Sequence, residues 1–258
     1  MRNLFKLTAL ALTLVMLLTT MFACAVTPTV DVIKERGTII MLTNAGFPPF
    51  EYPLSGSVAG VDVDIATEIA KELGVTLEIQ DMAFEGIVNA VKSGKGDMGV
   101  AGMSITEDRQ KNVDFSIEYV ASKLVILVRI DEAEITANDH LKGQTIAVQT
   151  GTTSDIFASD IEGATLSRFG TFLDAATALK SGKVRAVVVD EMTSNEILDK
   201  NPDLKKLDEP LTEERYAICV QKDNKTLLDA INAVLTRLLD EGKIDEFIYN
   251  HTSGEKAG

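Results

Sequence analysis

Three polar segments of the chain carry residue types that together suit a small zwitterion. The first ends in Arg109, and an arginine can clamp a carboxylate with two parallel hydrogen bonds, a geometry that lysine cannot match. The second contains Thr152 and Thr153 after a glycine, and the third ends in Asp190 after an apolar run. Asp190 can pair with an ammonium group. Because a free amino acid has both poles, these segments predict an amino-acid site.

Each of these residues also has a purely structural explanation. Arg109 stands among charged neighbours and could be a solvated helix residue. Ser104, Thr152 and Asp190 stand where helices are expected to start, and such residues often cap helices. Helix capping alone would explain only one of the two threonines, Thr152 and Thr153. Free N–H groups at a helix start also favour an anion, so capping and ligand binding are compatible.

Short runs rich in Val and Ile alternate with segments of helical period. Strands are predicted at residues 38–43, 75–80, 98–101, 123–129, 144–149, 164–168, 185–189 and 216–221. Helices are predicted at residues 62–73, 84–92, 171–180, 193–200 and 225–241. This alternation indicates an α/β fold with mostly parallel sheets flanked by helices. Asp190 then lies at the carboxyl edge of a sheet, where such folds bind ligands.

A repeated unit indicates two lobes. The letters Lys-Ser-Gly-Lys occur at residues 92–95 and again at 180–183, each time between a predicted helix and an apolar strand. Helix-stop chemistry alone can produce such a similarity, so the repeat is modest support for two α/β units. The chain is expected to cross from one lobe to the other at residues 116–128 and to return at 209–216.

Ordered motifs cover nearly the whole chain after its first 36 residues. They are Phe-Pro-Pro-Phe-Glu at 47–51, Gly-Val-Asp-Val-Asp-Ile at 60–65, Phe-Glu-Gly-Ile at 84–87, residues 102–109 with Val-Asp-Phe-Ser at 113–116, Val-Gln-Thr-Gly-Thr-Thr at 148–153 and Val-Asp at 189–190. In this order and spacing the chain resembles the extracellular solute-binding proteins of polar amino-acid ABC transporters, bacterial solute-binding protein family 3. The resemblance runs over residues 37–247.

The resemblance implies a type II periplasmic-binding-protein fold, with two lobes joined by a two-strand hinge. Lobe 1 would be discontinuous, with residues 37–121 and 217–250, and lobe 2 would hold residues 122–216. The protein would bind a free L-amino acid and deliver it to an ABC transporter permease and its ATPase. It would be a monomer without a cofactor or an enzymatic activity.

The resemblance also assigns roles within the site. Arg109 would hold the α-carboxylate together with the helix start at Thr152 and Thr153, while Asp190 would hold the α-ammonium with the Gly102 carbonyl and the Ser104 hydroxyl. Phe47 and Phe84 would be aromatic walls of the site, with core packing as the alternative for each. For Phe50, core packing is the expected role. The predicted ligand-binding residues are Asn44, Phe47, Phe84, Gly102, Met103, Ser104, Arg109, Gln149, Thr152, Thr153 and Asp190.

Two positions bear on which amino acid is bound. Members of the family that take basic amino acids commonly carry an acidic residue at the position of Asn44. Gln149 lies at another position that distinguishes between the side chains of bound amino acids in this family. Together these amides favour a polar neutral amino acid such as glutamine or cystine. The segment at residues 116–120 departs from the family pattern before the hinge.

The first residues resemble an export signal. Arg2 and Lys6 precede an apolar run that is too short and too interrupted to span a bilayer. Residues 1–23 are therefore predicted to be a signal peptide, with lipidation of Cys24 to anchor the protein at the cell surface. In the alternative, Cys24 is removed and the protein is periplasmic or secreted. Residues 24–36 would form a linker and 251–258 a flexible tail.

Composition excludes several classes. The net charge is −14, and loss of residues 1–23 would make it −16, which argues against nucleic acid. No His or Cys cluster predicts a metal site, and Cys219 stands in an apolar run. His140 and His251 are expected in solvated loops. An exported dehydratase of the cyclohexadienyl type shares this fold and would need a general acid, for which Glu51 or Glu191 are candidates. A sensor-type receptor is the third alternative.

Overall fold

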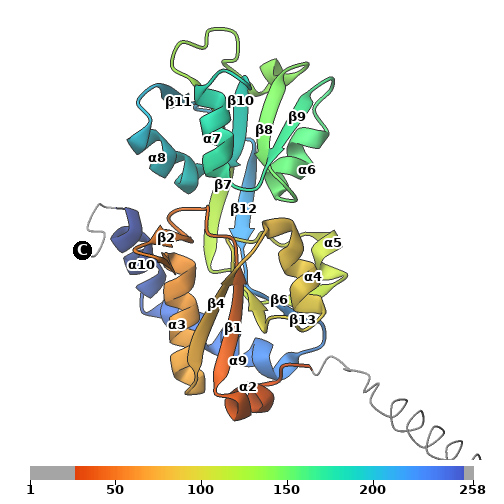
Figure 1. The fold of residues 1–258 in the computed structure, drawn as a ribbon, viewed down its shortest axis with the longest axis vertical. Coiled ribbons are helices and arrows are strands. Elements are labelled where there is room, and N and C mark those ends of the chain that lie inside the picture. The colour runs from red at the N-terminus through yellow and green to blue at the C-terminus, as the bar shows by residue number, and fades with distance from the viewer. Residues whose placement is uncertain (1–26, 253–258) are drawn as a thin grey trace, which may run out of the picture.

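The computed structural model describes residues 27–252. The predicted signal peptide and Cys24 lie outside these residues. The described chain forms two sheet-containing lobes, one above the other along the long axis of the molecule (Figure 1). We call the part around the five-stranded sheet lobe 1 and the part around the six-stranded sheet lobe 2. The predicted two-lobe α/β class is confirmed.

Lobe 1 contains both ends of the described chain. Its sheet has the order β4-β1-β5-β13-β6, and a small hairpin, β2 and β3, lies beside it. The strands are β1 (Thr38–Thr43), β2 (Tyr52–Leu54), β3 (Ser57–Ala59), β4 (Thr76–Asp81), β5 (Met98–Gly99), β6 (Val113–Phe115) and β13 (Cys219–Gln221). The helices are α2 (Val30–Arg36), α3 (Val61–Leu73), α4 (Ile87–Lys92), α5 (Glu107–Gln110), α9 (Lys225–Asp240) and α10 (Lys243–Thr252), with a short 3-10 helix η1 (Phe84–Gly86).

Lobe 2 is formed by the central part of the chain. Its sheet has the order β11-β7-β10-β8-β9, and β12 pairs with β7. The strands are β7 (Val120–Arg129), β8 (Thr145–Gln149), β9 (Thr165–Phe169), β10 (Ala186–Asp190), β11 (Leu204–Lys206) and β12 (Thr212–Tyr216). The helices are η2 (Asn138–Leu141), α6 (Thr153–Ser159), α7 (Phe172–Lys180) and α8 (Glu191–Lys200).

The two sheets are mixed rather than mostly parallel. In lobe 1, β1 pairs in parallel with β4 and β5, whereas β13 is antiparallel to β5 and β6. In lobe 2, β8 is parallel to β9 and β10, whereas β7 is antiparallel to β10, β11 and β12. The antiparallel strands are those at which the chain changes lobes, so they break the regular strand-helix alternation.

β7 and β12 form the connection between the lobes (Figure 1). They are antiparallel, with Val120 opposite Tyr216 and Leu124 opposite Thr212. β12 ends at Tyr216, and β13 begins in the other sheet three residues later, at Cys219. The residue boundaries 37–121 with 217–250 for lobe 1, and 122–216 for lobe 2, stay a prediction.

Local sequence explains where the helix that packs behind the lobe 1 sheet begins and ends. In α3, Ile65, Ile69 and Leu73 are buried on one face, as the four-residue spacing predicts. Gly74 ends the helix in the left-handed conformation with φ 71°, and its N–H bonds to the carbonyls of the last turn. At its start, the N–H groups of Val61 and Asp62 donate to the carbonyls of Pro49 and Phe50, so α3 holds the segment that leads into the site.

Three expectations about the ends of the chain need correction. The predicted linker at 24–36 contains helix α2, which Thr29 caps and which buries Ile33. The predicted tail begins too early, because residues 251 and 252 belong to α10. His251 is not a solvated loop residue, since its ring hydrogen-bonds Tyr52 and Asp64 at 2.9 Å each.

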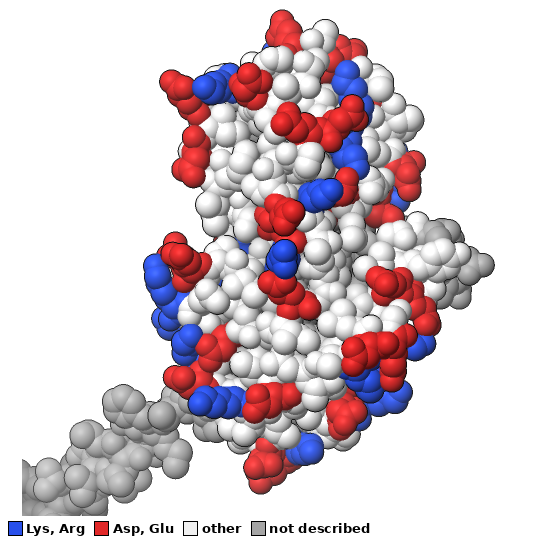
Figure 2. All heavy atoms as spheres, turned by 180° about the vertical axis from the view of Figure 1, so that it is seen from behind, with Lys and Arg blue, Asp and Glu red and all other residues white. Residues whose placement is uncertain are grey.

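Within residues 27–252, no helix has the length and apolar character needed to cross a membrane. Acidic and basic side chains are interspersed over the face shown in Figure 2, and the basic ones form no continuous patch there. That nucleic acid is not a partner stays a prediction from the net charge.

Candidate ligand-binding site

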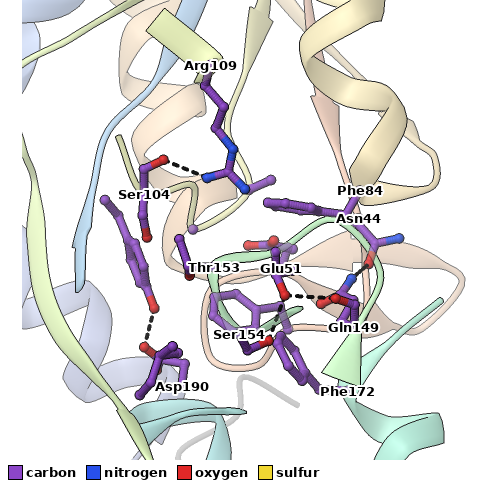
Figure 3. A pocket seen from close by; sticks show the side chains of 16 residues that line it. Asn44, Glu51, Phe84, Ser104, Arg109, Gln149, Thr153, Ser154, Phe172 and Asp190 are labelled. Carbon is purple, nitrogen blue, oxygen red and sulfur yellow. Dashed lines mark hydrogen bonds between the residues drawn. The ribbon is translucent and has the colours of Figure 1, made fainter. Parts of the chain in front are cut away.

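A cavity lies between the lobes and collects side chains from both. Figure 3 shows it from close by. Its lining residues are Asn44, Phe47, Glu51, Phe84, Ala101, Gly102, Ser104, Arg109, Leu124, Gln149, Thr152, Thr153, Ser154, Phe172, Asp190 and Tyr216. Every predicted site residue except Met103 is in this set. The structure therefore brings together predicted residues that lie up to 146 positions apart in the chain, from Asn44 to Asp190.

The lobes touch each other around this cavity. The Gln149 side-chain amide donates to Asn44 Oδ1 at 2.7 Å, and Arg109 Nη2 donates to the Gly151 carbonyl at 3.0 Å. Gly151 has φ 75°, and a side chain there would meet Glu85 Cβ at 2.7 Å, so only glycine permits this approach. The structure is thus a closed arrangement.

Arg109 is a buried cation whose side-chain hydrogen bonds go to neutral groups. It is 9% exposed, and its guanidinium donates to the carbonyls of Ser104 at 2.6 Å and Gly151 at 3.0 Å. The guanidinium also lies over the Phe84 ring, 5.3 Å from its centre. Burial lowers the pKa of Arg109, but an arginine stays protonated in proteins. A guanidinium has five N–H donors, so this one can still bind an incoming carboxylate.

Thr152 and Thr153 use their hydroxyls differently. The Thr152 hydroxyl caps α6, since it accepts from the Asp155 N–H at 3.3 Å and donates to the Gln149 carbonyl at 2.8 Å. The Thr152 hydroxyl thus fills the helix-capping role expected from the sequence, through contacts within lobe 2. The Thr153 hydroxyl donates instead to Glu214 Oε2 at 3.0 Å. Both residues line the cavity at the start of the helix.

Asp190 also performs the capping role that the sequence allows. Its Oδ1 accepts from the Met192 N–H at 2.8 Å, while its Oδ2 accepts from the Tyr216 hydroxyl. Burial raises the pKa of Asp190 to about 6, against the lowering effect of hydrogen bonds from Tyr216 and the α8 backbone. A cation placed beside this carboxylate would reverse that shift. Asp190 can therefore cap α8 and bind an ammonium through different parts of the same group.

Gly102 is held in a conformation that its neighbours require. It has φ 49°, and a Cβ there would lie 2.3 Å from Phe47 Cε1. Its N–H donates to Asp62 Oδ2 at 2.7 Å, and Asp62 Oδ1 accepts from the Tyr119 hydroxyl at 2.8 Å. This fixes the peptide next to the cavity, where its carbonyl is expected to face a ligand.

Aromatic rings from both lobes enclose the cavity. Phe47 stacks on Phe50 with ring centres 5.2 Å apart and lies 5.6 Å from Phe172 of lobe 2 and 6.0 Å from Tyr216. Phe50 is fully buried in the core, as expected, and does not line the cavity. Phe47 and Phe84 do line it. The walls can therefore grip an elongated side chain between flat faces.

Glu51 is a buried carboxyl group in the cavity wall. Its side chain is fully buried, and neither carboxylate oxygen has a hydrogen-bond partner among residues 27–252. Burial raises the pKa of Glu51 well above its usual value, and the nearby Asp62 carboxyl raises it further. Burial thus favours the neutral form of this group in the closed arrangement. Glu191, the other proposed acid, does not line the cavity and pairs with Lys206.

Met103 is not where the sequence prediction put it. Its side chain is fully buried in a core cluster of lobe 1 with Leu42, Phe84 and Ile87. The next residue, Ser104, forms a bridge to Tyr216 and faces the cavity. Because successive residues of an extended segment point to opposite sides, only one of the two can face the cavity.

Sequence reasoning missed five cavity residues and named Glu51 only as a candidate acid. The five are Ala101, Leu124, Ser154, Phe172 and Tyr216. Leu124 and Tyr216 come from the two connecting strands, and Phe172 is the first residue of α7. The only signal in the sequence was the expected lobe crossing at these strands. Among the described residues, no group of three or more His, Cys, Asp or Glu could hold a metal ion.

Comparison with known proteins agrees with this geometry. The family described as "Bacterial extracellular solute-binding proteins, family 3" matches residues 39–253. The arginine-binding extracellular protein ArtP of Bacillus subtilis (strain 168) is 30% identical over 224 residues, covering 84% of this chain and 87% of ArtP. The ABC transporter glutamine-binding protein GlnH of the same organism is also 30% identical over 224 residues, covering 84% of this chain and 82% of GlnH.

A solved structure is similar in sequence and in fold. The P235GK mutant of ArgBP from T. maritima is 42% identical to this chain, with a TM-score of 0.84. The match covers 87% of this chain and 99% of the ArgBP chain. These relatives are binding proteins rather than enzymes, as the sequence predicts.

Proposed function

This chain belongs to the bacterial extracellular solute-binding proteins, family 3, and we propose that it binds one free amino acid with a long polar side chain, foremost arginine, for import by an ABC transporter. One observation carries the proposal. Arg109 and Asp190 line the same cavity between two lobes, so a cation and a carboxylate are available to the two poles of a zwitterion. A dicarboxylate such as prephenate would place a second negative charge near the Asp190 carboxylate, which is unfavourable.

Glu51 supports arginine as the side chain that is bound. A buried carboxyl group without a hydrogen-bond partner in the cavity wall offers a place for a guanidinium, which fits a carboxylate with two parallel bonds. The aromatic faces of Phe47, Phe84 and Phe172 would hold the same planar group. Similarity to ArtP and ArgBP points in the same direction. Glu51 also has the raised pKa that a general acid needs, but these relatives are not enzymes.

Glutamine is the second candidate, in line with the polar neutral side chain that the sequence favours. The amides of Asn44 and Gln149 are hydrogen-bonded to each other at the cavity wall, and either can exchange this bond for one to a ligand amide. The neutral form of Glu51 can also donate a hydrogen bond to a carbonyl oxygen. GlnH is a relative of equal identity to ArtP.

We further propose that the partners are a permease and its ATPase, that the protein acts as a monomer, and that Cys24 is lipidated. The apolar segment before Cys24 supports an anchored protein outside the cytoplasm. Replacing Cys24 with Ala should release the protein from the membrane fraction into the medium. Full retention of the variant in the membrane would refute lipidation.

The deciding experiment is a thermal-shift screen of the ligand-stripped mature protein. The panel is the proteinogenic amino acids, cystine and prephenate. A ligand at about 1,000 times its dissociation constant adds about 4 kcal/mol to native-state stability, which raises the melting temperature. We expect the largest rise with L-arginine. A largest rise with L-glutamine would select the second candidate, and a rise with prephenate alone would refute amino-acid binding.

A further inference from the structure

Gly151 is held from two sides by side chains of opposite charge. Its carbonyl accepts from Arg109 Nη2 of lobe 1 at 3.0 Å, and its N–H donates to Asp155 Oδ2 of lobe 2 at 3.0 Å. Asp155 is 9% exposed and does not line the cavity. The two hydrogen bonds and the length of one residue place its carboxylate within about 10 Å of the Arg109 guanidinium. A buried negative charge therefore lies behind the pole proposed for the α-carboxylate of the ligand.

The Asp155 carboxylate acts against the anion that Arg109 is proposed to bind. Charges near a protein surface interact with an effective dielectric constant between about 20 and 80. At about 10 Å, a unit charge then changes the affinity for a carboxylate by roughly 2- to 15-fold. Glu85 also lies close to Gly151, but it is exposed, and solvent screens its charge. Asp155 is buried, so its charge lowers the affinity for the ligand unless a cation offsets it.

Arg168 on β9 supplies such a cation. Its Nε donates to both carboxylate oxygens of Asp155, at 3.0 Å and 3.1 Å, and its Nη2 donates to Ser159 Oγ at 3.2 Å. β9 and α6 are neighbours in lobe 2, so the pair lies entirely within this lobe (Figure 1). The Arg168 side chain is 48% exposed, and an ion pair with a partner so exposed contributes little to stability. A purely structural role therefore explains the pair poorly.

We propose that Arg168 is a positioning residue for the carboxylate pole, which acts through Asp155 by offsetting its negative charge. This inference rests on the proposed amino-acid binding and extends it. Asp155 holds the turn at Gly151 through the N–H of that residue, and the turn directs the Gly151 carbonyl to Arg109. Arg168 lets the turn keep this carboxylate without its repulsion of the ligand. Arg168 itself does not line the cavity.

The test is a charge cycle, read as dissociation constants for L-arginine and L-glutamine by calorimetry at low ionic strength. Arg168→Gln removes the cation and should weaken binding by roughly 3- to 10-fold. Asp155→Asn removes the anion, while its amide oxygen can still accept from the Gly151 N–H, and it should tighten binding by a similar factor. The double variant should return to within about twofold of the wild type. Arg129→Gln is the matched control, because Arg129 ends β7 away from the other lobe and also pairs with an aspartate, Asp131, at 3.3 Å; its affinity should stay within about twofold of the wild type.

The proposal requires the two single variants to change the affinity in opposite directions. Weaker binding in both would show a structural role of the pair, and any other departure from opposite signs would show that these charges do not act on the carboxylate pole. Equal weakening by Arg129→Gln would assign the effect to the net charge of the protein. The wild-type titration is read first. If the wild type binds neither amino acid, the proposed function fails and this inference falls with it, whereas a failure confined to the variants counts against Arg168 alone.

Discussion

Gly46 and Thr171 face each other across the closed cleft, and their contact gives a direct test of closure. A Cβ built on Gly46 of lobe 1 would lie 2.6 Å from Thr171 Cγ2 and 2.7 Å from Thr171 Cβ in lobe 2. Carbon atoms are at their optimal separation at about 3.5–4.0 Å, so Gly46→Ala would force the lobes apart by roughly 1 Å at this point. The φ of Gly46 lies outside the left-handed region, so alanine causes no strain when the lobes are apart.

The expected effect is therefore confined to the closed state. Overpacking a well-packed contact costs about 1–3 kcal/mol, which corresponds to roughly 5- to 150-fold weaker binding of a ligand that requires closure. We expect calorimetry with L-arginine, or with L-glutamine if it binds more tightly, to show this rise in the dissociation constant. The melting temperature of the ligand-free variant should stay within about 2 °C of the wild type, because an open protein has no clash.

Two further variants control for other causes. Gly170→Ala is the matched control, since Gly170 has no left-handed φ and no atom within 4 Å of a built Cβ, and its affinity should not change. Thr171→Gly in the Gly46→Ala background removes both close atoms and leaves Cα at 3.7 Å, so affinity should recover. Glycine is tolerated at an N-cap at a cost of a few tenths of a kcal/mol, and Thr171→Gly alone measures that cost. Wild-type affinity in Gly46→Ala would refute the closed arrangement as the bound state.

The remaining predictions concern the charges in the cavity. Arg109→Lys should weaken binding by roughly 10- to 100-fold, because lysine keeps the positive charge but cannot form the two parallel bonds, and a hydrogen bond to a charged group contributes about 1.5–3 kcal/mol. Affinity within twofold of the wild type would exclude a carboxylate clamp. Burial in the closed cavity raises the pKa of Asp190 to about 6, and the group must be ionised to hold an ammonium. Amino-acid affinity should therefore be constant above pH 6 and fall by up to about tenfold per unit below it, with a weaker dependence in Asp190→Asn; identical pH profiles of the two proteins would contradict this. If arginine binds at Glu51, whose pKa is raised well above its usual value, binding should be accompanied by proton release, measured by calorimetry in buffers of different ionisation enthalpy. Glu51→Gln should abolish the proton release and weaken the binding of arginine but not of glutamine. Proton release that persists in this variant would exclude Glu51 as the source of the proton.

Most sheet and helix positions follow from local pattern, and the failures have physical causes. The predicted strand 38–43 coincides with β1, because a short continuous apolar run between polar residues is typical of a buried strand. Helices α2 and α10 were missed, since the described structure buries only Ile33 in the first and Ile244 in the second. A helix that buries so little shows no clear apolar stripe.

The predicted strand 216–221 failed for a different reason. The structure divides it between β12, which ends at Tyr216, and β13, which begins at Cys219. All of residues 216–220 are buried, so hydrophobicity is continuous across the point where the chain leaves one sheet for the other. Periodicity describes burial and not the sheet to which a residue belongs.

The site was predictable where the chain concentrates polar residues at strand ends, as at Ser104 and Asp190. It was not predictable where the residue looked ordinary for its element. Tyr216 and Glu214 lie in a charged strand whose alternate residues are buried, a pattern that a solvated edge strand shares. Phe172 reads as the apolar start of a helix. Only the tertiary arrangement of the two connecting strands and α7 brings these groups to the cavity.

The proposed arrangement divides each pole of the ligand between the lobes. The carboxylate pole would take the Arg109 guanidinium from lobe 1 and the helix start at Thr153 from lobe 2. The ammonium pole would take the Gly102 carbonyl and the Ser104 hydroxyl from lobe 1 and Asp190 from lobe 2. Neither lobe holds a complete partner for either pole, so an open protein can offer the ligand only half of each. A ligand shifts an equilibrium only by its differential affinity for the two states, and here both poles contribute to that difference. A compound that lacks one pole should therefore lose closure as well as contacts.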